Sequence, residues 1–134
     1  MRSTTLEQVE VRTEEQVVKF RQLVRKWSTQ ERFSLVDQTK LVTAASEIAR
    51  NTVVHGGGGE GEIQLLEEGP RRGLRLILRD RGVGIENPEL ALRDGYTTGG
   101  GLGLGLGGAK RLVNEFELES RPGEGTRIAL TGWK

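Results

Sequence analysis

A glycine-rich run at residues 97–108 limits what this chain can fold into more than any other stretch. Seven residues from Gly99 to Gly108 are glycine, and fixing a glycine costs roughly 0.5 to 1 kcal/mol more than fixing an alanine. Leucines alternate with these glycines, which argues against a solvated linker. Residues 106–116 follow with apolar side chains at helical spacing. Backbone amides followed by the positive end of a helix favour an anion, so we predict a phosphate-binding loop.

Two well-known phosphate loops fit the run poorly. A Walker A loop ends in a glycine followed by lysine and then serine or threonine, and this run has no such ending. The spacing Gly103-x-Gly105-x-x-Gly108 matches the dinucleotide fingerprint. That fingerprint directly follows a strand, however, whereas residues 93–98 are typical of a loop. Any nucleotide site must therefore draw its other parts from elsewhere in the chain.

The apolar patterns predict an α+β fold. The early elements are a strand near Val9 and Val11, a helix from the Thr13-x-x-Gln16 capping box to Trp27, a polar break at residues 28–32, and a helix at residues 35–54. The later elements are an antiparallel hairpin that turns at residues 69–73, the helix at 109–116, and strands at 117–120 and 126–133. We expect a single domain over residues 1–134, built as a two-layer sandwich of a mostly antiparallel sheet with about three helices on one face.

Composition narrows the classes of protein to which the chain can belong. The 134 residues carry a net charge of +1, so no overall field attracts nucleic acid or an anionic membrane. The chain has no cysteine, which excludes a disulfide framework and thiolate chemistry. Apolar runs are short and nothing resembles a signal peptide, so we expect a cytoplasmic protein with neither a nucleic acid nor a membrane as partner.

Three polar side chains could carry the chemistry of a nucleotide site. Glu47 and Asn51 are four residues apart on a predicted helix, so they project from one face. A carboxylate beside an amide suits a magnesium–phosphate site, although such pairs also occur on solvated helix faces. Asp80 follows an apolar strand, and its carboxylate can accept a hydrogen bond from the exocyclic amine of adenine. Gly82 and Gly84 would let a flat ligand lie against the backbone, although an ordinary turn is the alternative.

Taken in order, these motifs resemble those of the GHKL ATPase family, which comprises gyrase, Hsp90, histidine kinases and MutL. Glu47-x-x-x-Asn51 resembles the N box, and Asp80-x-Gly82-x-Gly84 resembles the first glycine box. The alternate glycines from Gly99 resemble the second glycine box, and Gly125-Thr126 the closing threonine. Residues 46–51, 94–100 and 107–112 look like the small anti-sigma-type serine/threonine kinases, in particular the switch kinases of bacterial stressosomes. The resemblance covers nearly the whole chain.

The resemblance implies a role for each motif residue. Glu47 would be the catalytic base that takes the proton from a protein hydroxyl, and Asn51 would hold Mg²⁺. Asp80 would bind the adenine of ATP, with Gly82 and Gly84 as the pocket floor. Thr126 would support the adenine end through its hydroxyl. The residues expected around the phosphates, as part of a lid, are Thr98, Gly99, Gly101, Leu102, Gly103, Leu104 and Gly105.

The resemblance also implies partners. Kinases of this kind phosphorylate a serine or threonine of a STAS-domain protein, and near relatives then bind and activate a PP2C-type phosphatase, so we expect an ATP-dependent partner-switching kinase. An anti-sigma factor, or a nucleotide-dependent binding module without transfer chemistry, would have the same ATP site and stays an alternative. A detached ATPase fragment of a sensor kinase is disfavoured, because predicted strands open and close the fold.

Other residues receive plainer interpretations. His55 follows the N box and is expected to be a helix-end residue, because no second helix carries a phosphoacceptor histidine. Trp27, Phe116 and Trp133 are expected in the core. A basic cluster is expected around the hairpin, either simply solvated or docking an acidic partner surface. Its members are Arg71, Arg72, Arg75, Arg79 and Arg81.

Overall fold

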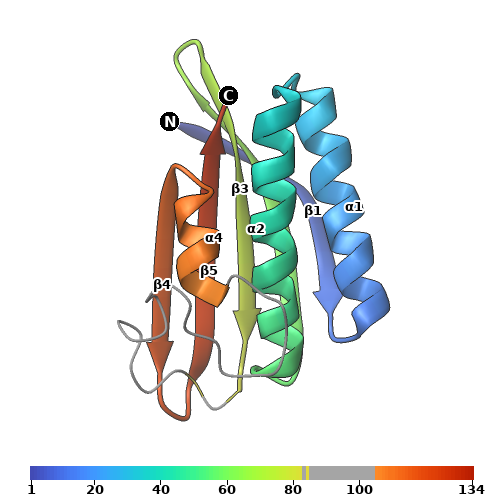
Figure 1. Cartoon of the computed structure of the whole chain (residues 1–134). Coiled ribbons are helices and arrows are strands. Elements are labelled where there is room, and N and C mark those ends of the chain that lie inside the picture. Colours follow the sequence, from blue (N-terminus) through green and yellow to red (C-terminus); the bar gives the residue numbers. More distant parts are fainter. Residues whose placement is uncertain (83, 85–104) are drawn as a thin grey trace.

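The chain folds into an antiparallel sheet with helices packed on one face. The structure is a computed structural model and describes residues 1–82, 84 and 105–134. Over these residues the sheet has five strands in the order β1-β2-β3-β5-β4, and every neighbouring pair is antiparallel (Figure 1). The strands are β1 Arg2–Val11, β2 Gly59–Glu68, β3 Arg71–Asp80, β4 Glu115–Arg121 and β5 Gly125–Trp133.

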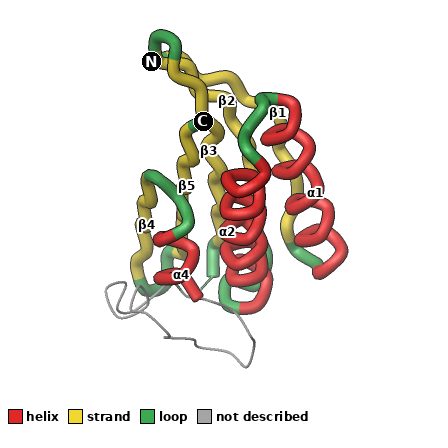
Figure 2. The backbone as a smooth tube through the Cα atoms, turned by 45° about the horizontal axis from the view of Figure 1, so that its top comes forward, coloured by secondary structure: helices red, strands yellow, loops and turns green. Residues whose placement is uncertain are grey.

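The described helices cover a single face of this sheet. They are α1 Glu14–Gln30, α2 Leu35–Val54 and α4 Gly105–Arg111. Helix α2 lies between the other two and contacts both (Figures 1 and 2). This arrangement confirms the expected α+β sandwich. Over the described part of the chain, no helix has the length and apolar character that a membrane span requires.

The hydrophobic core lies between the helices and β3, the central strand of the sheet. Leu74, Leu76 and Leu78 alternate along β3 and are almost fully buried against the helical layer. Helix α1 contributes Phe20 and Val24, which are completely buried. Because each buried side chain of this size contributes roughly 1.5 to 3 kcal/mol, this alternation fixes which face of the sheet the helices cover.

Side-chain caps fix where the two long helices begin. The Thr13 hydroxyl accepts a hydrogen bond from the Gln16 backbone N–H at 3.2 Å, as the capping-box pattern predicts. The Gln16 side chain reaches back to the backbone N–H of Arg12 at 2.7 Å, one residue earlier than a standard box. Ser34 caps α2 by accepting from the Asp37 N–H at 3.1 Å. The direction of α2, which carries the N-box residues, is therefore set locally.

The last predicted helix extends too far. Helix α4 ends at Arg111, and Val113 and Phe116 lie beyond it. Phe116 belongs to β4, where it pairs with Leu130 and packs against the core as a partly buried side chain. Apolar side chains of a short helix followed by an alternating strand had the same spacing as one longer helix, so periodicity could not separate the two.

Two other elements are longer than predicted. Strand β1 begins at Arg2 rather than near Val9, because it pairs with β2 along its whole length. Helix α1 continues to Gln30, past the predicted end at Trp27. Ser28, expected in a polar break, is buried inside the helix, where its hydroxyl donates to the Arg25 carbonyl at 3.1 Å. That hydrogen bond lets a polar residue continue the helix.

The predicted basic cluster is wrong as a single surface. Arg71 and Arg72 lie at the β2–β3 turn, whereas Arg79 and Arg81 lie at the opposite end of β3, about 25 Å away along the strand. Trp133 also departs from expectation, because it is only partly buried and stands outside the core cluster. Trp27 and Phe116 pack against the edge of the core, close to expectation.

Candidate nucleotide-binding site

Helix α2 presents Glu47 and Asn51 on the flank that faces away from α1. Gln38 marks the α1 side, because its Oε1 accepts hydrogen bonds from α1 side chains at 3.1 and 3.4 Å. Glu47 is rotated from Gln38 by about 180° around the helix, and Asn51 follows one turn later. Both side chains are half-buried, and neither has a hydrogen-bond or ion-pair partner within residues 1–82, 84 and 105–134. Within that part of the chain, no side chain competes with a ligand for these two polar groups.

Asp80, the last residue of β3, lies under the C-terminal end of α2. One carboxylate oxygen, Oδ1, accepts the backbone N–H of Gly82 at 2.9 Å. Gly56 lies so close that a methyl group added there would overlap the Asp80 carboxylate. The Gly56 N–H in turn donates to the Asn51 carbonyl at 3.2 Å. The N-box helix and the predicted adenine-binding carboxylate therefore meet at one end of the sheet.

The glycines of the first glycine box are packed against protein backbone. A Cβ added at Gly82 would meet the Gly56 carbonyl oxygen at 2.7 Å. A Cβ added at Gly84 would overlap the Arg121 carbonyl, and the φ of +78° at Gly84 disfavours any other residue. Close approach of backbone segments explains both glycines structurally. Their proposed part in the floor of a nucleotide pocket stays a prediction.

Thr126 lies directly opposite Asp80 in the β3–β5 ladder. Its hydroxyl is 2.8 Å from the Ser120 hydroxyl, and Ser120 Oγ is also 3.1 Å from the Gly125 carbonyl. Gly125 itself has a φ of +92°, and a Cβ there would overlap the Asp80 carbonyl. The turn between β4 and β5 is thereby fixed against the end of β3, which places the Thr126 hydroxyl at the same end of the sheet as the Asp80 carboxylate.

The predicted lid lies mostly outside the described residues. Thr98, Gly99, Gly101, Leu102, Gly103 and Leu104 are all in the part of the chain that is not described. Gly105 is described: it is the buried first residue of α4 and has a φ of +70°. Since only glycine adopts that conformation readily, the structure accounts for this one glycine of the run.

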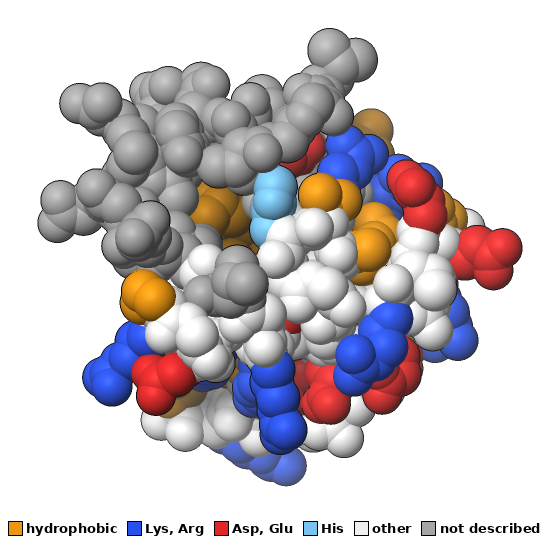
Figure 3. All heavy atoms as spheres, turned by 90° about the horizontal axis from the view of Figure 1, so that it is seen from below, with side chains coloured by type: hydrophobic (Ala, Val, Ile, Leu, Met, Phe, Trp, Pro, Cys, Tyr) orange, Lys and Arg blue, Asp and Glu red, His pale blue; other side chains and the backbone are white. Residues whose placement is uncertain are grey.

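A hollow of about 860 Å³ opens beside the Asp80–Thr126 pair at this end of the sheet. Arginine side chains line much of it, namely Arg12, Arg79, Arg81, Arg121 and Arg127. Glutamates lie within 4.0 Å of four of these arginines, namely Arg12, Arg79, Arg121 and Arg127. Figure 3 looks at this end of the molecule, where basic and acidic side chains lie interspersed. The lining of the hollow therefore has mixed charge.

The donor set suits Mg²⁺ that is held together with phosphates. Among the described residues, no group of three or more His, Cys, Asp or Glu side chains could hold a metal ion alone. Mg²⁺ commonly takes only one or two protein ligands and completes its shell with water and phosphate oxygens. The Asn51 amide oxygen and the neighbouring Glu47 carboxylate are hard oxygen donors on one helix flank. They fit such a site.

Sequence reasoning missed two residues of this site. Gly56 falls outside the elements predicted from sequence, yet a Cβ added there would overlap the Asp80 carboxylate. Ser120 was assigned only to a closing strand, yet its hydroxyl contacts that of Thr126. The four consecutive glycines at 56–59 were a usable signal for close backbone approach. Nothing in the local sequence distinguished Ser120.

Comparisons with known proteins place the chain in a family. Residues 36–132 match the family model described as "Histidine kinase-, DNA gyrase B-, and HSP90-like ATPase". The chain is 42% identical to serine/threonine-protein kinase RsbT of Bacillus subtilis over 93% of its own length and 94% of that protein. It is 32% identical to an anti-sigma F factor of Clostridium kluyveri over 72% of this chain and 71% of that protein.

Solved structures share the fold. A crystal structure of the RsbU and RsbW domains of Rv1364c from Mycobacterium tuberculosis superposes on the whole chain with a TM-score of 0.65 and 22% identity, over 33% of that longer chain. The mycobacterial sensor histidine kinase MprB covers 95% of this chain and 96% of its own, with a TM-score of 0.55 and 19% identity. Together with the family match over most of its length, these findings show that the chain belongs to the histidine kinase-, DNA gyrase B- and HSP90-like ATPases, the GHKL family.

Proposed function

We propose that this protein is an ATP-dependent serine/threonine-protein kinase that phosphorylates a STAS-domain protein and acts as a partner-switching regulator. A relative that is 42% identical over nearly its full length is named as a serine/threonine-protein kinase, which supports this class of enzyme. The matching family model is that of an ATPase, which supports ATP as the phosphate donor. The STAS-domain substrate follows from the motif resemblance.

One geometric observation carries the proposal. Gly56 hydrogen-bonds the Asn51 carbonyl on one side and contacts the Asp80 carboxylate on the other. A residue that could ligate the metal and one that could read the purine are thereby held at fixed separation by backbone contacts. Fixed placement of this kind is the main contribution that a protein makes to phosphoryl transfer.

The described residues then have the following roles. The Asp80 carboxylate, oriented by the Gly82 N–H, accepts a hydrogen bond from the adenine amine. Asn51 holds Mg²⁺, which neutralises phosphate charge when bound. Glu47 accepts the proton of a serine or threonine hydroxyl of the substrate. The hydroxyl oxygen forms a bond to the γ-phosphorus, and ADP leaves. Glu47 has no ion-pair partner among the described residues, which is consistent with a base that accepts a proton from an incoming hydroxyl.

The test is transfer of labelled phosphate from magnesium-ATP to a purified STAS-domain protein. Glu47→Ala should lower transfer by about a hundredfold or more while ATP binding persists in calorimetry. Glu15→Ala, which removes an exposed carboxylate on α1, is the matched control and should transfer normally. Normal transfer by the Glu47 variant would show that the base is wrong. Absence of any heat with adenosine nucleotides would overturn the whole proposal.

A second function is favoured by a separate observation. Several relatives between 28% and 32% identical are named anti-sigma F factors, and such a factor would use the same ATP site to control binding of a sigma subunit. Copurification with a sigma factor would support this function over phosphatase activation. If Asp80→Asn leaves the affinity for a partner unchanged, that result would support a binding module without transfer chemistry.

A further inference from the structure

The connection between α1 and α2 exposes apolar side chains. It lies far from the end of the sheet that carries Asp80 and Thr126, which we call the nucleotide end. Leu35 and Val36, the first two residues of α2, are 72% and 63% exposed. They belong to the few large hydrophobic side chains that the described residues leave in solvent. Adjacent exposed aliphatic residues at a helix start are unfavourable for solubility unless something covers them. We call Arg32, Leu35, Val36 and Lys40 the corner patch.

Arg32 is held in a conformation that favours glycine. Its φ is +61°, and within the described chain no other residue except glycine has a positive φ. The Arg32 N–H donates to the Thr29 carbonyl at 3.0 Å, and the Phe33 N–H donates to the Ser28 carbonyl at 2.9 Å. These bonds close the end of α1 in the way that usually places glycine at this position. The arginine side chain is therefore present despite the local backbone preference.

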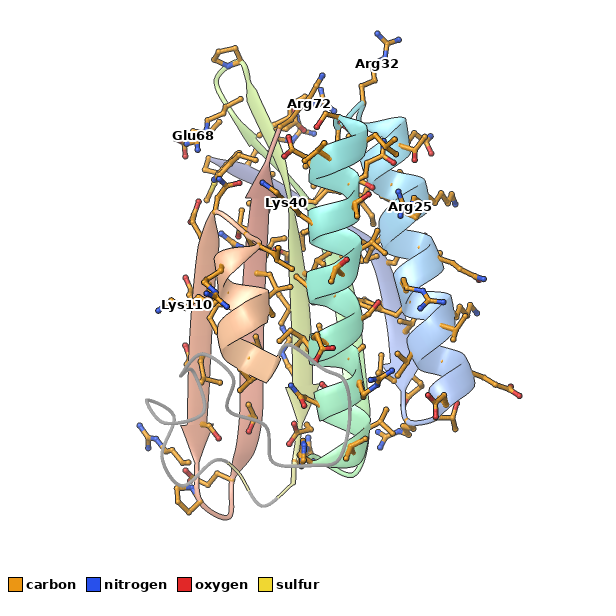
Figure 4. The ribbon with its side chains drawn as sticks, viewed as in Figure 1. Arg25, Arg32, Lys40, Glu68, Arg72 and Lys110 are labelled. Atoms are coloured by element: carbon orange, nitrogen blue, oxygen red, sulfur yellow. The ribbon has the colours of Figure 1, made fainter. Side chains whose placement is uncertain are left out.

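The basic groups of the corner patch lack partners within the described part of the chain. The Arg32 side chain is exposed and makes no hydrogen bond or ion pair there, and the same holds for Lys40. Figure 4 shows Arg32 extending away from the end of the two helices, with Lys40 further along α2. Lys40 lies one helical turn after Val36, so an apolar and a basic side chain share one face.

Neighbouring charges do not cancel this pattern. Arg72 lies at the same end of the molecule (Figure 4), where its Nε pairs with Glu31 Oε1 at 2.9 Å. Asp37 is exposed in the first turn of α2, where the positive end of the helix stabilises a carboxylate. The corner patch thus offers two aliphatic side chains beside two positive charges that have no ion-pair partner in the described part of the chain, with the exposed Asp37 carboxylate next to them.

We propose that the corner patch is a docking surface for an amphipathic helix of a partner protein that carries leucine-type side chains next to aspartate or glutamate. Charge complementarity selects an acidic partner, and Leu35 and Val36 supply the apolar contact. Along α2, the patch is about 24 Å from Asn51. A partner bound here would leave the nucleotide end open, and the proposal does not depend on the proposed kinase activity.

The probe is a pair of synthetic helical peptides with identical leucine positions, one with glutamate and one with lysine at the flanking positions. Methyl and amide NMR shifts of the full chain should move at Leu35 and Val36 with the acidic peptide only. Leu35→Ser and Arg32→Glu should each lower the affinity for the acidic peptide by about tenfold or more, whereas ATP affinity should not change. Gln22→Ala, which alters an exposed position on α1, is the matched control.

Arg32→Gly separates docking from folding. Glycine relieves the left-handed backbone, so this variant should melt about 3 °C higher while it binds the acidic peptide more weakly. Unchanged peptide binding in Arg32→Gly would overturn the role of the arginine. The proposal as a whole is overturned if no binding is detected at about 1 mM peptide, if both peptides bind equally, or if the shifts lie elsewhere. It is also overturned if Leu35→Ser abolishes self-association of the chain, because the patch would then bind a second copy.

Discussion

At the end of the sheet that carries Asp80, several glycines bring main chain close to main chain, whereas at the end that carries the β2–β3 turn a stacked pair of side chains lies beside an open turn. Glycines at 56, 59, 82 and 125 each have backbone or the Asp80 side chain where a Cβ would stand. At the far end, the Arg71 guanidinium lies 4.0 Å from the Trp133 ring centroid. Gly69 in the far turn has no atom within 4 Å of an added Cβ.

This difference indicates where the fold tolerates change. Side-chain contacts at the far end can relax by rotamer changes, but backbone packed on backbone cannot give way without moving a strand. At the nucleotide end, close backbone approaches therefore hold β3, the residues after α2 and the β4–β5 turn against one another. The same close approaches that exclude a methyl group there also fix Asp80 and Thr126, the two residues proposed to bind the adenine.

The largest expected contrast is between two glycine substitutions, one at each end. A Cβ at Gly59 would overlap the Arg79 carbonyl, so Gly59→Ala should destabilise the fold by about 3 kcal/mol. Gly69→Ala meets no atoms and has only its φ of +59° to overcome, which costs about 1 kcal/mol. Urea unfolding of both variants measures the difference. Equal losses of stability would show that the two ends are not built differently.

The next prediction concerns function at the nucleotide end. Gly56→Ala should displace the Asp80 carboxylate and lower ATP affinity by about tenfold or more, as calorimetry would measure. Gly57→Ala is the matched control, because its φ of +74° adds backbone strain but no atom lies within 4 Å of the new methyl group. The control should lose stability and retain ATP affinity. If both variants bind ATP equally well, the Gly56–Asp80 contact does not position the carboxylate.

Sequence reasoning predicted the fold well because strand and helix patterns in this chain are long and regular. The leucines of β3 alternate over the whole strand and α2 has a continuous apolar face, so class, element order and helix placement were confirmed. Prediction was wrong where two patterns have the same spacing, as at Phe116, and where a polar residue is satisfied inside a helix, as at Ser28. Such boundaries depend on tertiary partners that local periodicity does not contain.

The site was predictable as a set of motifs but not as a set of contacts. Spacing placed Glu47 and Asn51 on one flank of α2, and the structure agrees. Spacing could not reveal that Gly82 packs on Gly56, because that contact joins segments distant in the chain. The reason inferred for Gly82, room for a flat ligand, differs from the reason observed, which is close approach of backbone.

A smaller effect is expected from the hydroxyl pair at the nucleotide end. Thr126→Val keeps the shape of the side chain but removes the 2.8 Å contact with Ser120. Stability should fall by about 1 kcal/mol, and ATP affinity should fall several-fold if the hydroxyl supports the adenine. Thr131→Val on the same strand removes the partner of Arg75 Nε at 3.5 Å and should leave ATP affinity unchanged. Equal affinity in both variants would remove Thr126 from the site.

The smallest effect belongs to Glu62, which lies between the two ends on the face of the sheet opposite the described helices. Burial would raise the pKa of Glu62, but hydrogen bonds from Gln64 at 2.7 Å and Thr5 at 3.0 Å, with the nearby Arg79 charge, lower the pKa below its ordinary value.

A carboxylate with a lowered pKa stabilises the fold above about pH 4.3, and this contribution is lost as the pH falls through the folded-state pKa. Thermal melts between pH 7 and strongly acidic conditions should therefore show a shallower loss of stability in Glu62→Gln than in the parent protein. Glu68→Gln, an exposed change near the far turn, should follow the parent. If the Glu62 variant also follows the parent, the charge of Glu62 does not contribute to stability. The side-chain contacts of Glu62 in the middle of the sheet would then tolerate change, like those at the far end.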